Sequence, residues 1–528
     1  MNKKVCSFPI LFALLALLIG TCAVVFPASA QAAPTSTGSI TVSGTVASRY
    51  DAYQIFSANV VDGDSDAKIA TDLAWASDAV RDAALPVLHS AGMPNSQTTA
   101  QEAAEWLNTD SHLTSALSAQ LARSLQSSGA RPAALNAGTT AELPCGYWLI
   151  VADDDAIAQD EAGTAPIMAL VGGSAVTVKP KAATPKVKKH VLEDSTAAWQ
   201  KAADATVADD LYWRLSATVP AGLTAYDTYT VKFVDTMSAG LDPSKVAASM
   251  RVYVAAGADG GFDAVSCEGG SASSTPAKGW TDITSQCRVS VEGKAFTVRT
   301  GDLIAALGGA DAFTAGARVV AVYNAPLNSA CNHGIAKGNP NEVYLRYPRS
   351  PFADQSGDAG FTRTPSDDAC AYTWDLALTK RGSDGDKPLA GAVLSIADDR
   401  VTVSGVDSGK LEVRELKAPK GYTAFEGTRS VTVKAEGLDV DQVAAAKPKL
   451  TITAESPLRA DSADGSTGSL EASLINTPTG TPPSITTGGF MPSTGDMAMY
   501  AAAAAAVAGA ALIVVALLVK RGGGSHKE

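Results

Sequence analysis

Two apolar segments, one at each end of the chain, set the limits of the part that can fold in water. Near the start, two lysines precede an apolar run from Phe8 to Ile19, which is too short to span a bilayer comfortably. The small residues Ala28-Ser29-Ala30 then offer a site for a signal peptidase. This order predicts a cleaved signal peptide at residues 1–30 and an exported protein.

The other end has three parts in a set order. Met491-Pro492-Ser493-Thr494-Gly495 comes first, and an apolar run from Met497 to Val519 follows. As a helix with a rise of about 1.5 Å per residue, this run is long enough to cross a membrane. Lys520 and Arg521 come next, and positive charges hold such a segment on the cytoplasmic side. We therefore expect residues 31 to about 490 to lie outside the cell.

This succession of a short motif, an apolar span and a basic tail resembles the cell-wall sorting signal of Gram-positive surface proteins. The motif of that signal is Leu-Pro-x-Thr-Gly, and Met491 stands here in place of the leucine, followed by Pro492 and Ser493. The resemblance implies cleavage between Thr494 and Gly495 by a sortase, a cysteine transpeptidase that passes the threonine carbonyl to an amine. It also implies a location in the cell wall, reached through a transient membrane anchor at residues 497–519.

The composition of the whole chain is that of a folded protein. Hydrophobic residues make up 46% of the chain and charged residues 18%. The net charge of −12 argues against nucleic acid and anionic membrane surfaces as partners. Stretches rich in Pro, Thr, Gly or Ser predict linkers at 179–186, 348–368 and 477–490. They separate a first region (34–178), a middle region (187–347) and a third region (371–476).

The three regions are predicted to be mainly β. In the middle and third regions, short runs of Val, Thr and Tyr between Gly and Asp turns favour β-sandwiches of immunoglobulin-like shape. Aromatic residues of the middle region, such as Trp213 and Phe233, are expected in its core. The first region has strand patterns at both ends, whereas 72–89 and 99–125 are rich in Ala and Leu at helical spacing. We therefore expect helices added to a β domain there.

The third region contains a lysine, an acid and an asparagine at three characteristic positions. Lys380 ends its first strand, Asn476 ends its last strand, and Glu415 begins the string Glu-Leu-Lys-Ala-Pro-Lys-Gly-Tyr between them. This resembles the collagen-adhesin B-type domain of Gram-positive pilins, in which a first-strand Lys and a last-strand Asn form a spontaneous isopeptide bond, assisted by the Glu of an E-x-x-A-P-x-G-Y box. The resemblance implies a bond between Lys380 and Asn476 with Glu415 as the assisting acid.

The chemistry explains why these residue types have to meet. An exposed Lys amine is protonated at neutral pH, with a reference pKa of about 10.4, and cannot attack. Burial disfavours the charged forms, so it lowers the pKa of a Lys and raises that of a Glu. The acid can then hydrogen-bond the amide oxygen and relay protons, the amine attacks, and ammonia leaves. The product ties the first strand to the last, so a pulling force cannot peel the domain open.

The middle region has a second set of the same residue types. Lys188 lies on its expected first strand, Asp235 in the string Asp-Thr-Met-Ser-Ala-Gly-Leu, and Asn341 in Gly-Asn-Pro-Asn. These strings resemble those of pilin middle domains, where the Asp is the assisting acid, so Lys188, Asp235 and Asn341 are the expected trio. The alternatives are Lys186 or Lys189 for the lysine and Asn339 for the asparagine. The first region contains only one lysine, Lys68, away from the first strand, so no such bond is expected there.

Sortase polymerisation of a pilin needs an exposed amine on the next subunit. In the family this amine belongs to the Lys of a W-x-x-x-V-x-V-Y-P-K motif at the end of the N-terminal domain. The string Val176-Thr177-Val178-Lys179-Pro180-Lys181 is similar to the second half of this motif and implies Lys181 as the acceptor. Lys179 stands where Tyr is usual and is the competing acceptor. Gly172 replaces the Trp.

Five cysteines remain outside the signal peptide, an odd number, so at least one is unpaired within a monomer. The most local pairings would join Cys267 with Cys287 and Cys331 with Cys370, although sequence does not establish connectivity. No catalytic motif for an external substrate is visible, and we expect no metal or cofactor. The chain is therefore expected to be a substrate of sortase, with no enzymatic activity beyond its own intramolecular bonds.

Taken together, the resemblances identify a suspected backbone (major) pilin of a sortase-assembled fimbria. They imply a shaft subunit that supports adhesion, with Thr494 of one copy joined to Lys181 of the next. The implied partners are a pilin-specific sortase, neighbouring copies, accessory pilins, peptidoglycan and a host receptor of unknown identity. The alternative is a monomeric wall-anchored adhesin or a minor pilin at the tip or base, which would use the sorting signal without the acceptor lysine.

Overall fold

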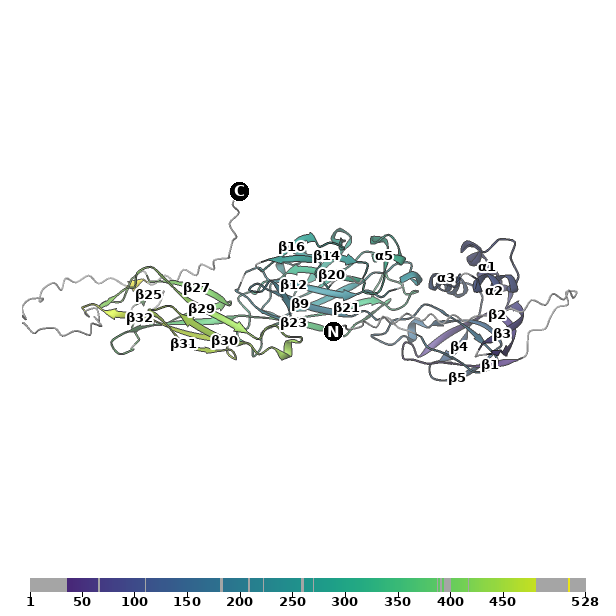
Figure 1. Ribbon diagram of the computed structural model, residues 1–528, viewed down its shortest axis with the longest axis horizontal. Helices are drawn as coiled ribbons and strands as arrows, with labels where there is room; N and C mark the ends of the chain where they lie inside the picture. Colours follow the sequence, from purple (N-terminus) through teal and green to yellow (C-terminus); the bar gives the residue numbers. More distant parts are fainter. Residues whose placement is uncertain are drawn as a thin grey trace, which may run out of the picture.

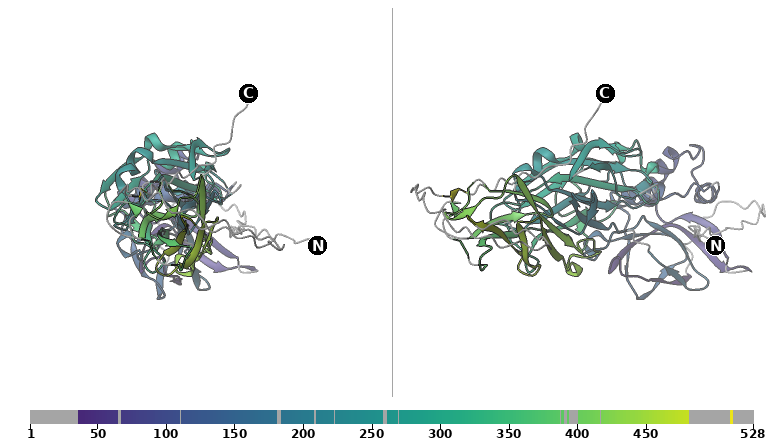
Figure 2. Two further views of the ribbon diagram at one scale, coloured as in Figure 1. Left: turned by 90° about the vertical axis from the view of Figure 1, so that its left-hand side faces the viewer. Right: turned by 60° about the vertical axis from the view of Figure 1, so that its left-hand side comes forward.

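The computed structural model describes residues 36–480 and 511–512, with short gaps in the first range. These gaps are at 65–66, 110, 181–183, 208, 222, 258–260, 269, 387, 390–391, 394–399 and 416. The predicted signal peptide, sorting motif and acceptor Lys181 therefore lie outside the described residues. Three β-rich parts follow one another along the long axis (Figure 1), and seen end-on they overlie one another (Figure 2). The prediction of a mainly β, multi-domain chain is confirmed.

The first part combines two sheets with three helices. One sheet has the order β5-β1-β8, and the other has the order β3-β2-β6-β7 with β4 beside β2. The strands are β1 (Thr37–Val42), β2 (Arg49–Asp62), β3 (Lys68–Trp75), β4 (Ala133–Asn136), β5 (Thr140–Pro144), β6 (Gly146–Ala152), β7 (Ile167–Val171) and β8 (Val176–Val178). The helices are α1 (Asp78–Ser90), α2 (Ala100–Asn108), α3 (Ser115–Gln126) and the short η2 (Asp154–Ala156).

The helices of this part start where polar caps place them. Ser77 and Thr114 accept hydrogen bonds from the backbone amides of Val80 and Leu117, and Thr99 forms a capping box at the start of α2. The helix expected at 72–89 begins later than predicted, at Asp78, because residues through Trp75 pair with β2. The expected helix at 99–125 is divided into α2 and α3.

The middle part is a sandwich of two sheets. The first has the order β10-β9-β12-β20-β14-β17, and the second has the order β11-β23-β21-β13-β19-β18 with β22 beside β21. The first sheet consists of β9 (Val187–Glu193), β10 (Ala198–Gln200), β12 (Tyr212–Thr218), β14 (Arg251–Ala255), β17 (Thr281–Asp282) and β20 (Arg318–Asn324). The second consists of β11 (Ala202–Asp204), β13 (Lys232–Met237), β18 (Arg288–Glu292), β19 (Ala295–Arg299), β21 (Asn339–Pro348), β22 (Phe361–Arg363) and β23 (Asp367–Tyr372).

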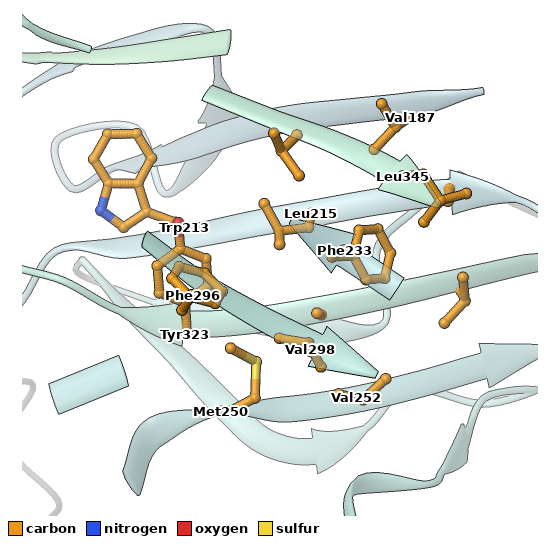
Figure 3. Close-up of a cluster of buried hydrophobic side chains, with 14 of the residues drawn as sticks. Val187, Trp213, Leu215, Phe233, Met250, Val252, Phe296, Val298, Tyr323 and Leu345 are labelled. Carbon is orange, nitrogen blue, oxygen red and sulfur yellow. The ribbon is translucent and has the colours of Figure 1, made fainter. Parts of the chain in front are cut away.

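Short elements complete this part. They are the hairpin β15 (Val265–Glu268) and β16 (Ser271–Pro276), the helices α4 (Val246–Ser249) and α5 (Leu303–Ala306), and the 3-10 turns η3 (Leu223–Ala225), η4 (Pro243–Lys245), η5 (Thr284–Gln286) and η6 (Ala310–Ala312). The core lies between the two sheets (Figure 3), and Trp213, Phe296 and Tyr323 lie close together at one end of it. As expected, Trp213 and Phe233 are fully buried core residues.

The middle part extends further than the sequence predicts. Residues 348–368 were expected to be a linker, but β22 and the start of β23 lie in this stretch and both pair with β21. β23 also pairs in parallel with β11. Because the stretch is rich in Gly, Ser and Asp, its composition does not reveal that backbone pairing with β21 holds its ends in the sheet.

The third part packs one sheet of order β26-β24-β32-β28, with β31 beside β32, against the sheet β27-β29-β30. Its strands are β24 (Trp374–Gly382), β26 (Arg400–Val406), β27 (Gly409–Arg414), β28 (Tyr422–Thr423), β29 (Thr428–Glu436), β30 (Lys449–Ala454), β31 (Leu458–Asp464) and β32 (Ser469–Pro478), with the turn η7 (Val443–Ala445). The first and last strands, β24 and β32, are direct parallel neighbours.

The predicted membrane span lies almost entirely outside the described residues. Only Ala511 and Leu512 of this segment are described, as the two-residue strand β33 beside β25 (Ala392–Val393). Among the residues that the structure describes, none of the helices has the length and hydropathy needed to cross a bilayer.

Candidate functional site: two buried lysine–acid–asparagine clusters

The first cluster lies between the sheets of the third part. Its residues come from both ends of this part, since Lys380 lies on β24 and Asn476 on β32, where Gly382 is the direct partner of Asn476. Glu415 follows the end of β27 in the opposite sheet. The exposed fractions of the three residues are 3% for Lys380, 5% for Glu415 and 1% for Asn476. The parallel pairing of first and last strands therefore places the amine and the amide in one buried cluster.

Glu415 connects the amine to the amide. Lys380 Nζ donates a hydrogen bond to Oε1 of Glu415. Asn476 Nδ2 lies 2.8 Å from Oε2 and 3.1 Å from Oε1 of the same carboxyl. The Thr423 carbonyl accepts a further hydrogen bond from Asn476 Nδ2 at 2.8 Å. The backbone amide of Phe425 holds Oε2 of Glu415 at 3.2 Å.

Two features of this cluster suit an acyl transfer. Burial lowers the pKa of Lys380, and the neighbouring Glu415 opposes that shift only in part. Asn476 Oδ1 is buried and has no hydrogen-bond partner among the described residues. A carbonyl oxygen left unpaired in this way is ready to accept a proton or a hydrogen bond when negative charge develops on it.

The second cluster bridges the two sheets of the middle part. Lys189 on β9 and Tyr323 on β20 come from one sheet, and Asp235 on β13 and Asn341 on β21 come from the other. In the antiparallel pair β13–β21, Met237 is the partner of Asn341, so Asp235 and Asn341 share the inward face. All four residues are 0% exposed.

The contacts of the second cluster meet at Tyr323 and Asp235. Lys189 Nζ donates to Oδ2 of Asp235 and lies 2.9 Å from the Tyr323 hydroxyl. That hydroxyl donates to Asp235 Oδ2 at 3.1 Å and accepts from Asn341 Nδ2 at 2.8 Å. Lys189 Nζ also lies 5.5 Å from the ring centre of Trp213. Oδ1 of Asp235 and Oδ1 of Asn341 are buried without a hydrogen-bond partner among the described residues.

The electrostatics of this cluster favour its neutral forms. Burial lowers the pKa of Lys189 to about 8, even though Asp235 acts in the opposite direction. Burial also raises the pKa of Asp235, and Lys189 offsets part of the effect. The pKa of Tyr323 is raised well above its usual value by burial and by Asp235. A neutral amine beside a protonated carboxyl is thus accessible, which is the state needed for attack on an amide.

The prediction of Lys188 as the lysine of this cluster was wrong. The side chain of Lys188 is 56% exposed and pairs with Asp367 at 3.5 Å, whereas the alternative Lys189 occupies the core. Side chains alternate along a strand, so Lys189 shares the inward face with Val187 and Val191. This alternation was a usable signal in the sequence. Lys186 is exposed as well.

The asparagine and the acid lie where they were expected. Asn339, the alternative to Asn341, is also buried, but its amide is satisfied by the backbone. Its Nδ2 donates to the carbonyls of Asn332 and Ala371 at 2.9 and 3.2 Å, and its Oδ1 accepts from the amide of Asn332 at 2.8 Å. Tyr323 was not predicted, because all seven residues of β20 are buried and nothing in their order marks one tyrosine.

The remaining predicted residues lie elsewhere. Lys68 in the first part donates to the carbonyls of Gly172 and Ser174. Lys179, the competing acceptor, is exposed directly after β8, whereas Lys181 and the motif from Met491 to Gly495 fall outside the described residues. The two expected disulfides are not formed, since Cys267, Cys287, Cys331 and Cys370 are free thiols, as is the buried Cys145.

Comparison with known proteins finds a bacterial surface protein and several solved pilin structures that are similar to the chain. No model of a known protein family matches the chain. The trypsin-resistant surface T6 protein of Streptococcus pyogenes serotype M6 is 32% identical over 132 residues, which are 21% of this chain and 24% of that protein. The chain thus matches about a quarter of the length of this relative.

Two solved pilin structures align with the chain over most of its length. The T6 backbone pilin of S. pyogenes has a TM-score of 0.45 at 16% identity, covering 84% of this chain and 98% of that one. The major pilin SpaA of Corynebacterium diphtheriae has a TM-score of 0.34 at 12% identity, covering 84% of this chain and 99% of the other.

Proposed function

We propose that this protein is the shaft subunit of a covalently polymerised fimbria on a Gram-positive cell, and that internal isopeptide bonds stabilise it. The observation that carries the proposal is the pair of dry clusters in which an amine and an amide share a carboxyl group. A buried Lys with a single acid beside it would be a costly way to hold a fold together. Formation of a covalent bond removes both buried charges, and this explains why such a cluster would be built into the core.

In the third part, the proposed reaction starts with transfer of a proton from Lys380 to Glu415. The neutral amine attacks Cγ of Asn476, and Glu415 passes its proton to the leaving nitrogen, which its two oxygens already contact at 2.8 and 3.1 Å. Glu415 then takes the second proton from Nζ, so it ends protonated. Ammonia leaves and a Lys380–Asn476 amide remains. In the middle part, Lys189 is proposed as the attacking amine, Asp235 as the acid that takes its first proton, and Asn341 as the amide that is attacked. Folding supplies the proximity, worth up to roughly 7–11 kcal/mol in well-oriented intramolecular reactions.

The internal bonds are tested by the mass of the protein. Each bond expels one ammonia, so the exported part should be about 17 Da lighter per bond than its sequence. Two bonds are expected, and digestion should yield the joined peptides of Lys189 with Asn341 and of Lys380 with Asn476. Recovery of both lysine peptides unlinked would refute the cross-links.

Polymerisation is a separate part of the proposal. The sorting motif would be cut after Thr494, and the acyl group passed to Lys181 of the next subunit. Lys179 is exposed directly after the end of β8. The amine is best assigned by comparing Lys181→Ala with the matched Lys179→Ala in a cell that carries the pilin sortase. A ladder of polymers lost only in Lys181→Ala supports the assignment, and a ladder lost only in Lys179→Ala moves it to Lys179.

A ladder that is absent from the wild-type protein, with monomer attached to the wall, would instead favour the alternative of a monomeric adhesin or minor pilin. Peptidoglycan and accessory pilins are the further partners that the proposal includes. The receptor that such a fimbria would contact has no assigned site among the described residues.

A further inference from the structure

The hydroxyl of Tyr323 occupies a place in the middle cluster that has no counterpart among the described residues of the third part. It lies within hydrogen-bond distance of the attacking nitrogen of Lys189, of the carboxyl of Asp235 and of the leaving nitrogen of Asn341, at 2.9, 3.1 and 2.8 Å. In the third part, both carboxyl oxygens of Glu415 contact Asn476 Nδ2 directly. In the middle cluster no hydrogen bond joins Asp235 to Asn341, and the hydroxyl stands between them.

We propose that Tyr323 is a catalytic residue of the middle-domain cross-link, in which its hydroxyl relays a proton from the amine of Lys189 to the leaving nitrogen of Asn341. This inference rests on the proposed isopeptide bond. In the middle part, the Tyr323 hydroxyl would make the contact with the leaving nitrogen that the carboxyl of Glu415 makes in the third part.

The difference between the clusters follows from the length of the acid. Glu415 has one methylene more than Asp235, and its carboxyl reaches both nitrogens of its cluster. The shorter Asp235 contacts Lys189 through Oδ2, while Asn341 Nδ2 bonds to the phenol instead. The phenol hydroxyl uses its full capacity of one donated and two accepted hydrogen bonds in this arrangement.

The proposed step balances without an added reagent. Asp235 first takes one proton from the ammonium group of Lys189, and the neutral amine attacks Cγ of Asn341 to form the Nζ–Cγ bond. Nζ then passes one proton to the Tyr323 oxygen, while Tyr323 gives its own proton to Nδ2. The Cγ–Nδ2 bond breaks and ammonia leaves. Nζ has lost two protons in all, one to Asp235 and one through Tyr323, and the leaving group departs as neutral NH3. Tyr323 ends as it began, and Asp235 ends protonated.

The surroundings keep the phenol in place and protonated. Its ring packs edge-on against Phe296, with ring centres 4.8 Å apart and planes inclined by 72°. The raised pKa of Tyr323 means that the group remains a neutral hydroxyl. A neutral hydroxyl can accept and donate in the same step, whereas a phenolate has no proton to give to the leaving nitrogen.

The test compares Tyr323→Phe with wild type and with Tyr253→Phe. The control also removes a hydroxyl from a fully buried tyrosine of the middle part, one that donates to the Ser274 carbonyl at 3.0 Å outside the cluster. Full-length chains are translated in vitro, quenched in acid at intervals and digested. Mass spectrometry then follows both joined peptides, so the bond of the third part reports on every molecule as an internal control.

We expect Tyr323→Phe to slow formation of the Lys189–Asn341 peptide by about 100-fold or more, the scale of general acid–base catalysis. The Lys380–Asn476 peptide should form at the wild-type rate, and both peptides should form normally in Tyr253→Phe. A middle-domain bond that forms in Tyr323→Phe within about threefold of the wild-type rate overturns the relay. Absence of that bond from the wild-type chain overturns the proposed cross-link itself, so the two failures are distinguishable.

A second variant covers the case in which Tyr323→Phe does not fold. Placing 3-fluorotyrosine at position 323 keeps the ring and the hydroxyl but makes the hydroxyl more acidic. A purely structural role predicts an unchanged rate of bond formation at position 189, which would overturn the relay. A changed rate, with the third-part bond unaffected, supports it.

Discussion

Replacing Lys380 by Met tests whether the third part depends on a covalent tie between its first and last strands. Met keeps an unbranched chain of similar length among apolar neighbours but has no amine, so no bond to Asn476 can form. Glu415 retains its hydrogen bonds from Asn476 and from the amide of Phe425, which limits the disturbance of the pocket. Lys410→Met is the matched control, because the side chain of Lys410 is 60% exposed.

The expected loss of stability follows from the length of the closed loop. Positions 380 and 476 are 96 residues apart in the chain. By the chain-entropy relation used for disulfides, a cross-link that closes a loop of this length stabilises the fold by about 4.7 kcal/mol. For a domain of about 100 residues, this corresponds to roughly 20–40 °C in Tm.

The assay is differential scanning calorimetry of residues 31–490, together with the intact mass. One unfolding transition should move down by at least roughly 20 °C in Lys380→Met, with the mass deficit of about 17 Da lost from the same protein. Lys410→Met should keep both the transition and the deficit. If Lys380→Met loses the mass deficit but no transition moves by more than a few degrees, the loop-closure reasoning is refuted.

Three further predictions follow from the described residues. Asp235→Asn should abolish the middle-domain bond while leaving the third-part bond intact, so peptide mapping should find Lys189 unlinked; a normal Lys189–Asn341 peptide would contradict the role of Asp235. Burial, and next the charge of Asp204, raise the pKa of Glu193 to about 7 from 4.5, so the folded protein holds a proton that the unfolded chain releases in this range. The stabilisation that protonated Glu193 contributes should therefore be complete below about pH 4.5 and lost as the pH rises through about 7. The Tm should fall between pH 5 and 8, and a Tm that rises would refute the assignment. Burial raises the pKa of Cys287 to about 11 and that of Cys370 to about 12. Both thiols should therefore resist alkylation at pH 8 in the folded protein and react after unfolding without reductant. Recovery of either cysteine in a disulfide would contradict the prediction that both are free thiols.

Local sequence signals predict the third-part cluster well. The string from Glu415 to Tyr422 is contiguous, and Lys380 and Asn476 lie near the ends of the expected first and last strands. Their meeting needs only that the first and last strands pair, which β24 and β32 do. The same alternation selects Lys189 over Lys188 in the middle part, because Val187, Lys189 and Val191 share the inward face of β9.

Other features depend on pairing between distant segments and are not visible in composition. Residues 348–368 resemble a linker because they are polar and rich in Gly, yet β22 and the start of β23, in the last third of this stretch, pair with β21. The start of α1 at Asp78 depends on β3, whose partner β2 comes earlier in the chain. Cys331 and Cys370 were a possible pair by their order in the chain, but both are free thiols, and they belong to two different hydrophobic clusters.

The sequence by itself determined the residue types of both clusters and the alternation that turns them inward, and it predicts the order of signal peptide, domains and sorting motif. These features are local, since each depends on neighbours within a few residues. Only the tertiary structure decided which groups touch. Lys189 and Tyr323 come from one sheet and Asp235 and Asn341 from the other, so their contacts exist only once the two sheets pack face to face. That packing excludes water, and burial is what shifts the pKa of Lys189 and Asp235 toward their neutral forms.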